Sequence, residues 1–292
     1  MPRTGKISRA FFRDHIAPQL GADRAETTLG PRHGVDFGVL DIGGQVLALA
    51  TDPVSILPGL GFERAARFAV RIVLADVAVS GLDPSHLAVG FTLPSDFGDA
   101  DFATVWTAIH DECASLGVDI VTGHTARYAG CSFPWVGAAT ALAVGDHESV
   151  VRPDGARVGD DLVMTTGPAV EAASLFASLF PAEIDCDDDR LARVAAMLDE
   201  LDVVRDARAL APVDGVTAMH DITEGGLLGA LHEMAAGTDA PFRVDSDRVP
   251  TDDDVATVCS TLEMAPWPAT SSGSTVGAVD PHSTPAAPAP PR

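Results

Sequence analysis

The sequence predicts an α/β protein with mixed sheets, divided into two domains. Strand-like and helix-like segments alternate along both halves of the chain, and such alternation is typical of α/β architectures. Glycine-ended hairpins occur among these segments, which favours mixed sheets over a purely parallel, doubly wound sheet. The 292 residues, 46% of them hydrophobic, are enough for one large domain or two ordinary domains with packed cores.

The first half contains a predicted hairpin and a series of alternating helices and strands. A short amphipathic helix is expected over residues 8–20. The run VDFGVLDIGGQVLALA at 35–50 has the pattern of a β-hairpin with Gly43 and Gly44 at its turn. Its second strand is expected to stop at Pro53. Further along we expect strands over 86–93, 118–121 and 133–144, and helices over 62–81 and 99–117 that end at Gly81 and Gly117.

The second half repeats the alternation after a joint. Residues 146–161 are rich in turn formers and predict a boundary between domains at 1–148 and 149–280. The proline-alanine tail at 281–292 is expected to be disordered. Expected strands lie over 161–166, 216–219 and 275–279, and helices over 168–180 and 187–202, after 220–227, and after a cap at 251–254.

The charge excludes several classes of protein. A net charge of −23 repels nucleic-acid phosphates. The acids are spread along the chain, so adaptation to a high-salt cytoplasm explains them better than a dedicated cation-binding surface. The only lysine, Lys6, cannot serve a phosphate-binding P-loop or a protein-kinase strand.

Nothing in the sequence indicates a membrane or an oxidising environment. No apolar run reaches the roughly 20 residues that span a bilayer, and the N-terminus has no secretory signal. The four cysteines are widely spaced, without a zinc or disulfide pattern. We therefore expect a cytoplasmic protein.

Three aspartates form a candidate magnesium site. Asp36 lies in the first strand of the predicted hairpin, Asp52 follows the second, and Asp76 interrupts an apolar helix. A carboxylate on an apolar helix face is costly unless it is paired or binds a cation, and Mg²⁺ prefers such oxygen ligands. The alternative is that each residue is a helix cap or a solvated acid.

Two glycine-containing segments could approach an anion. Gly123, His124 and Thr125 follow a predicted strand, where backbone N–H groups could meet a phosphate. The segment HDITEGGL at 220–227 places an imidazole, two carboxyl groups and two glycines at the start of a helix. The alternatives are a structural histidine and an ordinary capping box.

Taken in order, these motifs resemble the aminoimidazole ribonucleotide (AIR) synthase-like superfamily over residues 30–279. Its members include thiamine-monophosphate kinase, selenophosphate synthetase and the hydrogenase-maturation dehydratase, and the last branch is the most similar. The motifs that carry the resemblance are GVDFGV at 34–39, TDP at 51–53, LADVAVSGLDP at 74–84, GHT at 123–125, MHDITEGGLLGAL at 219–231 and TSSGS at 270–274.

The resemblance implies two domains of the PurM-like fold and a homodimer in which the N-terminal sheets form a shared barrel. It implies an ATP- and Mg²⁺-dependent enzyme that phosphorylates a small amide- or carbonyl-type oxygen or a phosphate. Carried over to this sequence, the metal ligands would be Asp36, Asp52 and Asp76. The nucleotide-binding residues would be Gly123, His124, Thr125, Asp221, Gly225 and Gly226.

The sequence also departs from the family pattern. His124 stands where many members have an acidic residue, and the second domain is expected to be shortened after TSSGS. The chain ends at Arg292 without a nearby cysteine to accept a carbamoyl group, which disfavours the maturation reaction itself. Selenophosphate synthesis is disfavoured by the lack of an N-terminal cysteine. A thiamine-phosphate-type kinase would need a second phosphate site. A non-catalytic, dimeric nucleotide-binding or scaffold protein is the alternative function.

Overall fold

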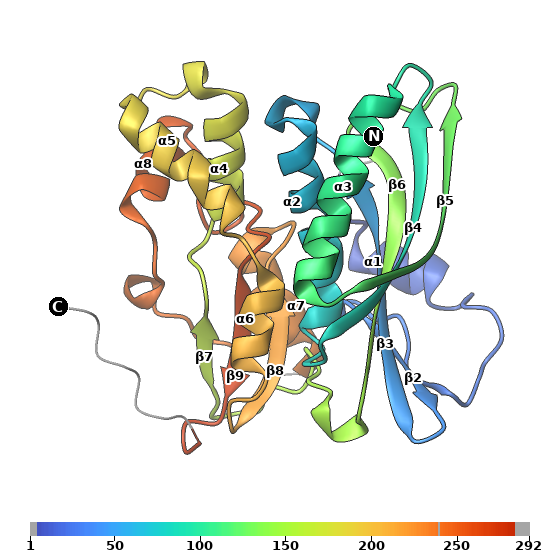
Figure 1. Cartoon of the computed structure of the whole chain (residues 1–292). Coiled ribbons are helices and arrows are strands. Elements are labelled where there is room, and N and C mark those ends of the chain that lie inside the picture. The colour runs from blue at the N-terminus through green and yellow to red at the C-terminus, as the bar shows by residue number, and fades with distance from the viewer. Residues whose placement is uncertain (1–4, 239, 284–292) are drawn as a thin grey trace.

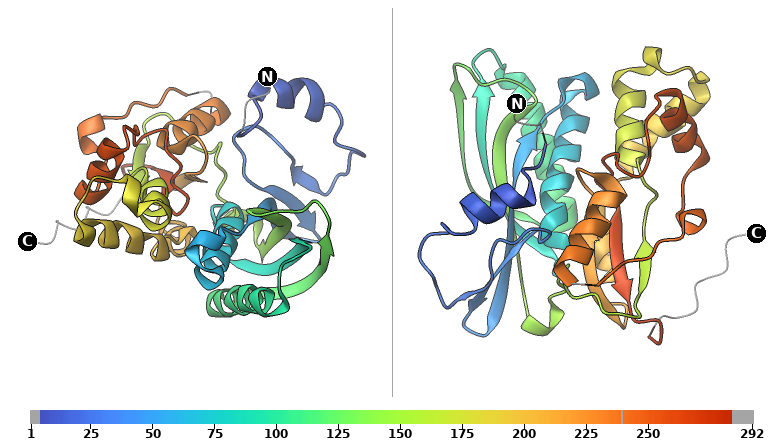
Figure 2. Two further views of the ribbon diagram at one scale, coloured as in Figure 1. Left: turned by 90° about the horizontal axis from the view of Figure 1, so that it is seen from above. Right: turned by 180° about the vertical axis from the view of Figure 1, so that it is seen from behind.

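The computed structural model describes residues 5–238 and 240–283, which form two α/β units with separate sheets (Figures 1 and 2). The first sheet has the order β1-β2-β3-β6-β4-β5, and the second has the order β7-β9-β8. The strands of the first sheet are β1 (Thr27–Leu29), β2 (Gly38–Ile42), β3 (Gln45–Ser55), β4 (Pro84–Pro94), β5 (Asp119–Tyr128) and β6 (Trp135–Gly145). The predicted α/β class with mixed sheets is confirmed.

The first sheet combines a parallel pair with antiparallel neighbours. β4 and β5 are parallel and are joined through a helix, whereas β2–β3, β3–β6 and β4–β6 are antiparallel. The hairpin with Gly43 and Gly44 between its strands is confirmed. The expectation that Pro53 ends the second strand is wrong, because β3 continues to Ser55. β2 pairs with β3 only as far as Leu49, so one edge of β3 is free of β2 where the proline lies.

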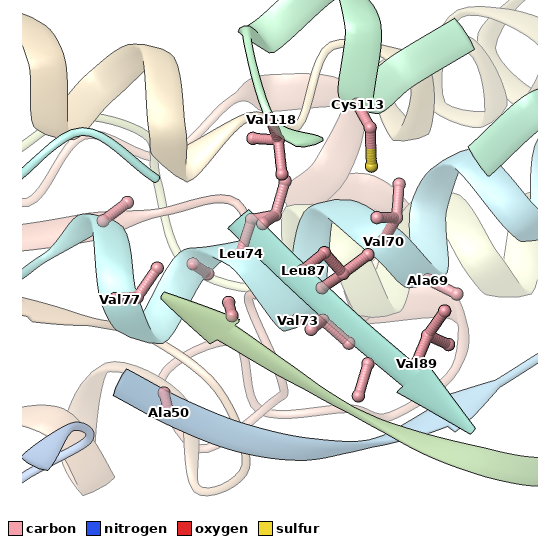
Figure 3. Close-up of a cluster of buried hydrophobic side chains, with 14 of the residues drawn as sticks. Ala50, Ala69, Val70, Val73, Leu74, Val77, Leu87, Val89, Cys113 and Val118 are labelled. Carbon is pink, nitrogen blue, oxygen red and sulfur yellow. The ribbon is translucent and has the colours of Figure 1, made fainter. Parts of the chain in front are cut away.

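Two helices cover one face of this sheet and build the main core (Figure 3). They are α2 (Phe62–Ala78) and α3 (Asp99–Leu116). Val73 and Leu74 of α2 are buried together with Leu87 of β4, and each such side chain contributes about 1.5–3 kcal/mol by leaving water. α3 ends at Gly117 as predicted.

The second unit places five helices around its three strands. β9 (Thr275–Val279) lies between β7 (Asp161–Met164) and β8 (Val216–Asp221) and is antiparallel to both. The helices are α4 (Val170–Leu179), α5 (Asp188–Ala196), α6 (Val203–Leu210), α7 (Gly226–Thr238) and α8 (Asp253–Thr261). The sequence did not predict α6. The side chains of Asp187 and Asp252 cap α5 and α8 by accepting backbone N–H bonds.

The N-terminal segment forms a short helix that Ser8 caps. It consists of α1 (Arg9–Phe11) and a π-helical turn over Phe12–Ile16, so it ends earlier than the predicted residue 20. Most of the predicted tail, residues 284–292, lies outside the described residues. Within residues 5–238 and 240–283, no helix combines the length and apolar character needed to cross a membrane.

Candidate functional site

Four carboxyl groups, from three elements and one loop, lie near one another where the two units adjoin. Asp36 lies in the loop before β2, Asp52 within β3, Asp76 on α2, and Asp221 is the last residue of β8. Burial raises the pKa of Asp36, Asp52 and Asp76, and the charge of Asp221 raises each of them further, so the four side chains share one electrostatic environment. Ligand atoms of Asp36, His220 and Asp221 all lie within 4.8 Å of one another, and Asp52 and Asp76 form a neighbouring pair that interacts electrostatically with Asp221.

The backbone around Asp36 explains its place beside β8. Asp36 is not in a strand, as the sequence predicted, but in the loop between β1 and β2. Gly34 in this loop has φ of +77°, and a Cβ there would lie 2.9 Å from the carbonyl oxygen of Glu233 on α7. Only glycine lets the loop approach α7 this closely, and this approach carries Asp36 to the end of β8.

Asp52 and Asp76 form a carboxyl pair. Burial raises the pKa of both groups. A hydrogen bond between the two carboxyl groups favours ionised Asp52 and protonated Asp76, so the pKa of Asp76 stands well above its usual value. Contact between two buried carboxyl groups favours a state in which one is ionised and the other is protonated.

Asp36, His220 and Asp221 form the more buried part of the site. His220 Nδ1 lies 3.3 Å from Oδ2 of Asp36 and 3.6 Å from Oδ1 of Asp221. Oδ2 of Asp36 and both carboxylate oxygens of Asp221 are buried without a hydrogen-bond partner among the described residues. Burial raises the pKa of Asp36 to about 7. Unsatisfied buried carboxylate oxygens are costly, and a hard cation such as Mg²⁺ would satisfy them. The residues present therefore fit the implied metal.

His220 acts as an internal counter-charge to these acids. Its Nδ1 donates a 2.6 Å hydrogen bond to the backbone carbonyl of Asp221, and its Nε2 lies 3.3 Å from Oε2 of Glu233. Burial lowers the pKa of His220, but Asp36, Asp221 and Glu233 raise it well above the usual value. An imidazolium has no free lone pair for a metal, so we assign the ligand role to the carboxylates. The sequence did not single out His220 as a separate functional residue.

Lys6 also lies at this site, although no sequence motif indicated a binding role for it. Its Nζ donates a 3.3 Å hydrogen bond to Oγ1 of Thr223 and lies 3.8 Å from Oε2 of Glu233. No sequence signal could link Lys6 to residues more than 200 positions away. Its being the only lysine of the chain was the single available hint.

Gly123, His124 and Thr125 do not join the acidic cluster within one chain. The expected turn is wrong, because all three lie inside the exposed edge strand β5. His124 Nε2 lies 3.2 Å from the hydroxyl of Tyr128, and His124 lines a shallow hollow of about 370 Å³ together with Trp135. These residues lie on a different part of the molecule from Asp221.

The two glycines at the start of α7 have different surroundings. Gly225 is exposed at the end of the loop that leaves β8. Gly226 is buried with φ of +60°, and a Cβ there would lie 2.4 Å from the carbonyl oxygens of Trp267 and Ala269. Packing within the chain therefore already requires glycine at 226, whereas Gly225 is open to a ligand.

A well-formed cavity lies elsewhere, beside the second sheet. Its volume is about 570 Å³, and Leu162, Leu231 and Phe242 contribute to its apolar lining. None of the predicted site residues lines this cavity. The orphaned carboxylates, rather than the cavity, identify the candidate site.

The fold and this site define an α/β protein of two units, with buried acidic side chains from both units gathered at one place. The chain belongs to the AIR synthase related protein family: the family's N-terminal domain matches residues 34–143 and its C-terminal domain matches residues 157–288. The predicted superfamily is confirmed.

Individual relatives come from more than one branch of this family. A putative hydrogenase expression/formation protein of Methanocaldococcus jannaschii is 24% identical, over 94% of this chain and 80% of its own length. A thiamine-monophosphate kinase of Halobacterium salinarum is 29% identical, over 78% of this chain and 73% of its own. A solved structure of the hydrogenase maturation protein HypE in complex with ATP has a TM-score of 0.68 at 21% identity, covering 96% of this chain and 80% of that chain. This structural similarity confirms the PurM-like fold.

Proposed function

We propose that the protein is an ATP- and Mg²⁺-dependent enzyme of the AIR synthase-like superfamily that phosphorylates a small amide-type, carbonyl-type or phosphate substrate in the cytoplasm. The observation that carries the proposal is the set of unsatisfied buried oxygens on Asp36 and Asp221, contributed by different domains. The relative solved with ATP supports the choice of nucleotide.

Each residue of the site would have a separate role in binding Mg²⁺ and phosphate. Asp36 and Asp221 would hold Mg²⁺, and the carboxylate of Asp52 would complete the site while Asp76 keeps the proton of the pair. His220 would keep Asp36 and Asp221 in place by its charge. When bound, Mg²⁺ supplies the positive charge that phosphoryl transfer needs. Gly225, exposed beside Asp221, would let a phosphate approach the backbone.

We also propose a homodimer formed through the uncovered face of the first sheet. Along β6, Ala139, Ala141 and Ala143 are buried under α2, and the alternate residues are more exposed. Trp135 and Val144 of β6 and Tyr128 of β5 are among the exposed large hydrophobic residues of this sheet. A second copy covering this face would remove them from water.

The decisive test is calorimetric titration with a non-hydrolysable ATP analogue, with and without Mg²⁺, at molar salt. Binding should require Mg²⁺, should be lost in Asp221→Asn, and should persist in Asp111→Asn, which alters an exposed carboxylate on α3. Absence of binding by the unaltered protein in both conditions would reject the proposal.

A non-catalytic nucleotide-binding or scaffold protein is the second candidate, favoured by His124 in place of the family's acidic residue. Phosphate release from ATP separates the two functions when it is assayed across small amides, aminoimidazole precursors and thiamine monophosphate. Turnover that disappears in Asp52→Asn would reject the scaffold; binding without any turnover would favour it.

A further inference from the structure

The N-terminal segment places the chain's only lysine over the acidic site. Lys6 is 217 positions away from Thr223, the residue whose hydroxyl accepts its hydrogen bond. Residues 9–16 continue from it as the short helix that Ser8 caps. This segment precedes the first sheet in sequence, but at Lys6 it contacts the loop after β8 and helix α7 of the second unit.

The negative charges around Lys6 belong to acidic residues in and beside the site. Burial lowers the pKa of Lys6, but Glu233, Asp36, Asp221 and Glu224 together raise it above the ordinary value. The lysine charge in turn lowers the pKa of Asp52 against the effect of burial. Lys6 therefore interacts electrostatically with both the Asp36 and the Asp52 sides of the cluster.

Lys6 remains available to a ligand, whereas His220 does not. The Lys6 side chain is 45% exposed, and the His220 side chain is 1% exposed. An ammonium group has three N–H donors. One is used on Thr223 at 3.3 Å, and the approach to Glu233 is 3.8 Å, too long for a hydrogen bond. The remaining donors can reach an anion entering the site.

A phosphate entering this site needs such a donor. The cluster contains four aspartates with Glu224 and Glu233 nearby, and these repel phosphate oxygens. Mg²⁺ on the aspartates would remove part of this repulsion. Among the groups that act most strongly on Asp36, the cations are His220 and Lys6. Lys6 alone of these two is exposed enough to touch a ligand.

We propose that Lys6 is a ligand-contacting residue whose ammonium group binds the phosphate oxygens of the Mg²⁺-bound nucleotide. The proposal rests on the proposed function and adds a residue to that same site. Lys6 keeps its proton throughout and forms no covalent bond. Its contribution is charge and hydrogen bonding, which are strong when one partner is ionised.

The first test uses the single lysine as a chemical reporter. The protein is acetylated with an amine-reactive ester, with and without a non-hydrolysable ATP analogue and Mg²⁺, and the product is read by peptide mass spectrometry. Lys6 is the only side-chain amine, and the α-amino group serves as the internal control. The Mg²⁺-nucleotide complex should slow acetylation of Lys6 about tenfold and leave the α-amine unchanged. Equal labelling of Lys6 in both conditions would overturn the proposal.

The second test compares variants by calorimetry. Lys6→Met should weaken Mg²⁺-nucleotide binding about tenfold or more, the loss of one charged hydrogen bond. Lys6→Arg should retain most of the affinity. Arg9→Met, which removes a neighbouring charge from the same segment, should have little effect. If the unaltered protein binds and Lys6→Met binds equally well, only the role of Lys6 is rejected. If the unaltered protein does not bind, the proposed function is rejected as well.

Discussion

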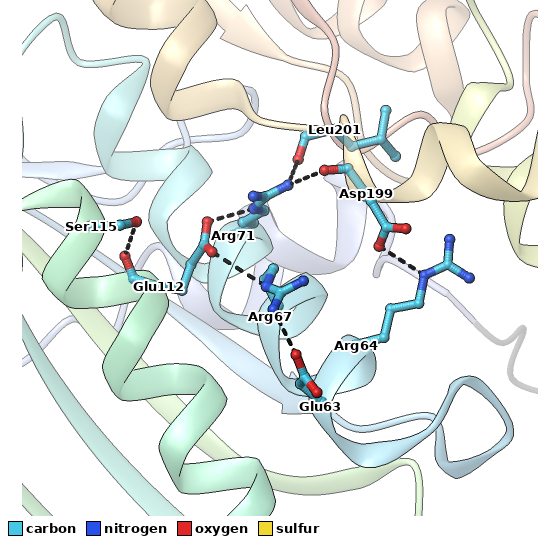
Figure 4. Close-up of polar contacts among 8 residues, drawn as sticks. All are labelled: Glu63, Arg64, Arg67, Arg71, Glu112, Ser115, Asp199 and Leu201. Atoms are coloured by element: carbon cyan, nitrogen blue, oxygen red, sulfur yellow. Dashed lines mark hydrogen bonds and ion pairs between the residues drawn. The ribbon is translucent and has the colours of Figure 1, made fainter.

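Arg71 on α2 donates a 2.6 Å hydrogen bond from Nε to Oε1 of Glu112 on α3 (Figure 4). The same guanidinium donates from Nη1 to the backbone carbonyls of Asp199 and Leu201, at 2.7 and 3.1 Å. Arg71 therefore joins the helices of the first unit to the segment of the second unit that leads into α6. Because the acidic site lies between the units, this contact helps to fix the site's geometry.

Arg71→Met should destabilise the protein by about 3 kcal/mol, because it leaves the carboxylate of Glu112 buried without its main partner. Glu112 is 7% exposed, and its remaining contact to Arg67 is longer, at 3.6 Å. Urea denaturation would measure the loss. Arg13→Met is the control, because Arg13 pairs with Asp14 at an exposed position. A similar small change in both variants would contradict the prediction.

The stability of the ion-free protein should fall as the pH rises from about 4 to 7. Burial raises the pKa of Asp36 from an ordinary value near 4 to about 7. The folded state therefore binds this proton more tightly than the unfolded state, and its advantage is lost on ionisation. Mg²⁺ requires the ionised carboxylate, so it should raise the melting temperature more at pH 8 than at pH 5.5. A Mg²⁺ effect that is larger at pH 5.5 would contradict this assignment.

Asp36→Asn should separate stability from ion binding. Without Mg²⁺ at pH 8, the variant should melt at a higher temperature than the unaltered protein, because it no longer buries this charge among other acids. It should also lose most of the stabilisation by Mg²⁺. Thermal denaturation with and without the ion measures both effects. Asp111→Asn should change neither, and a lower melting temperature for ion-free Asp36→Asn would count against the model of the site.

Asp254→Asn should destabilise the protein at low salt and have much less effect at molar salt. Asp254 accepts hydrogen bonds from Nε of Arg193 and Nε of Arg190, at 2.7 and 2.8 Å, and these lower its pKa to about 2. Its stabilising effect is therefore present above pH 4 and is lost as the pH falls toward 2. The groups are at the surface, where salt screens such pairs. Melting curves across salt and pH test this; an effect that persists at molar salt would contradict it.

The sequence predicted most elements because their patterns are local. The hairpin at Gly43 and Gly44, the helix ending at Gly117 and the cap of α8 at 251–254 depend on residues a few positions apart. Pro53 misled the prediction because its tolerance in β3 depends on where β2 ends. α6 was missed because only eight residues form it.

The candidate site was predictable only in part. Asp76 was indicated because a carboxylate on an apolar helix face is costly unless it is paired, and Asp36 and Asp52 were indicated by their places on the predicted hairpin. Their association with His220 and Lys6 depends on how the two domains pack, which no local pattern encodes. His124 was grouped with them from its family motif, yet within one chain it lies on the edge strand β5.

The loop that carries Asp36 reaches α7 only because Gly34 has no side chain. Any larger residue at position 34 would push this loop away from Glu233 and draw Asp36 back from Asp221. A Gly34→Ala protein should therefore keep both sheets and yet lose affinity for the ion. The absence of a methyl group at position 34 is what allows the two units to bring their carboxylates to the same place.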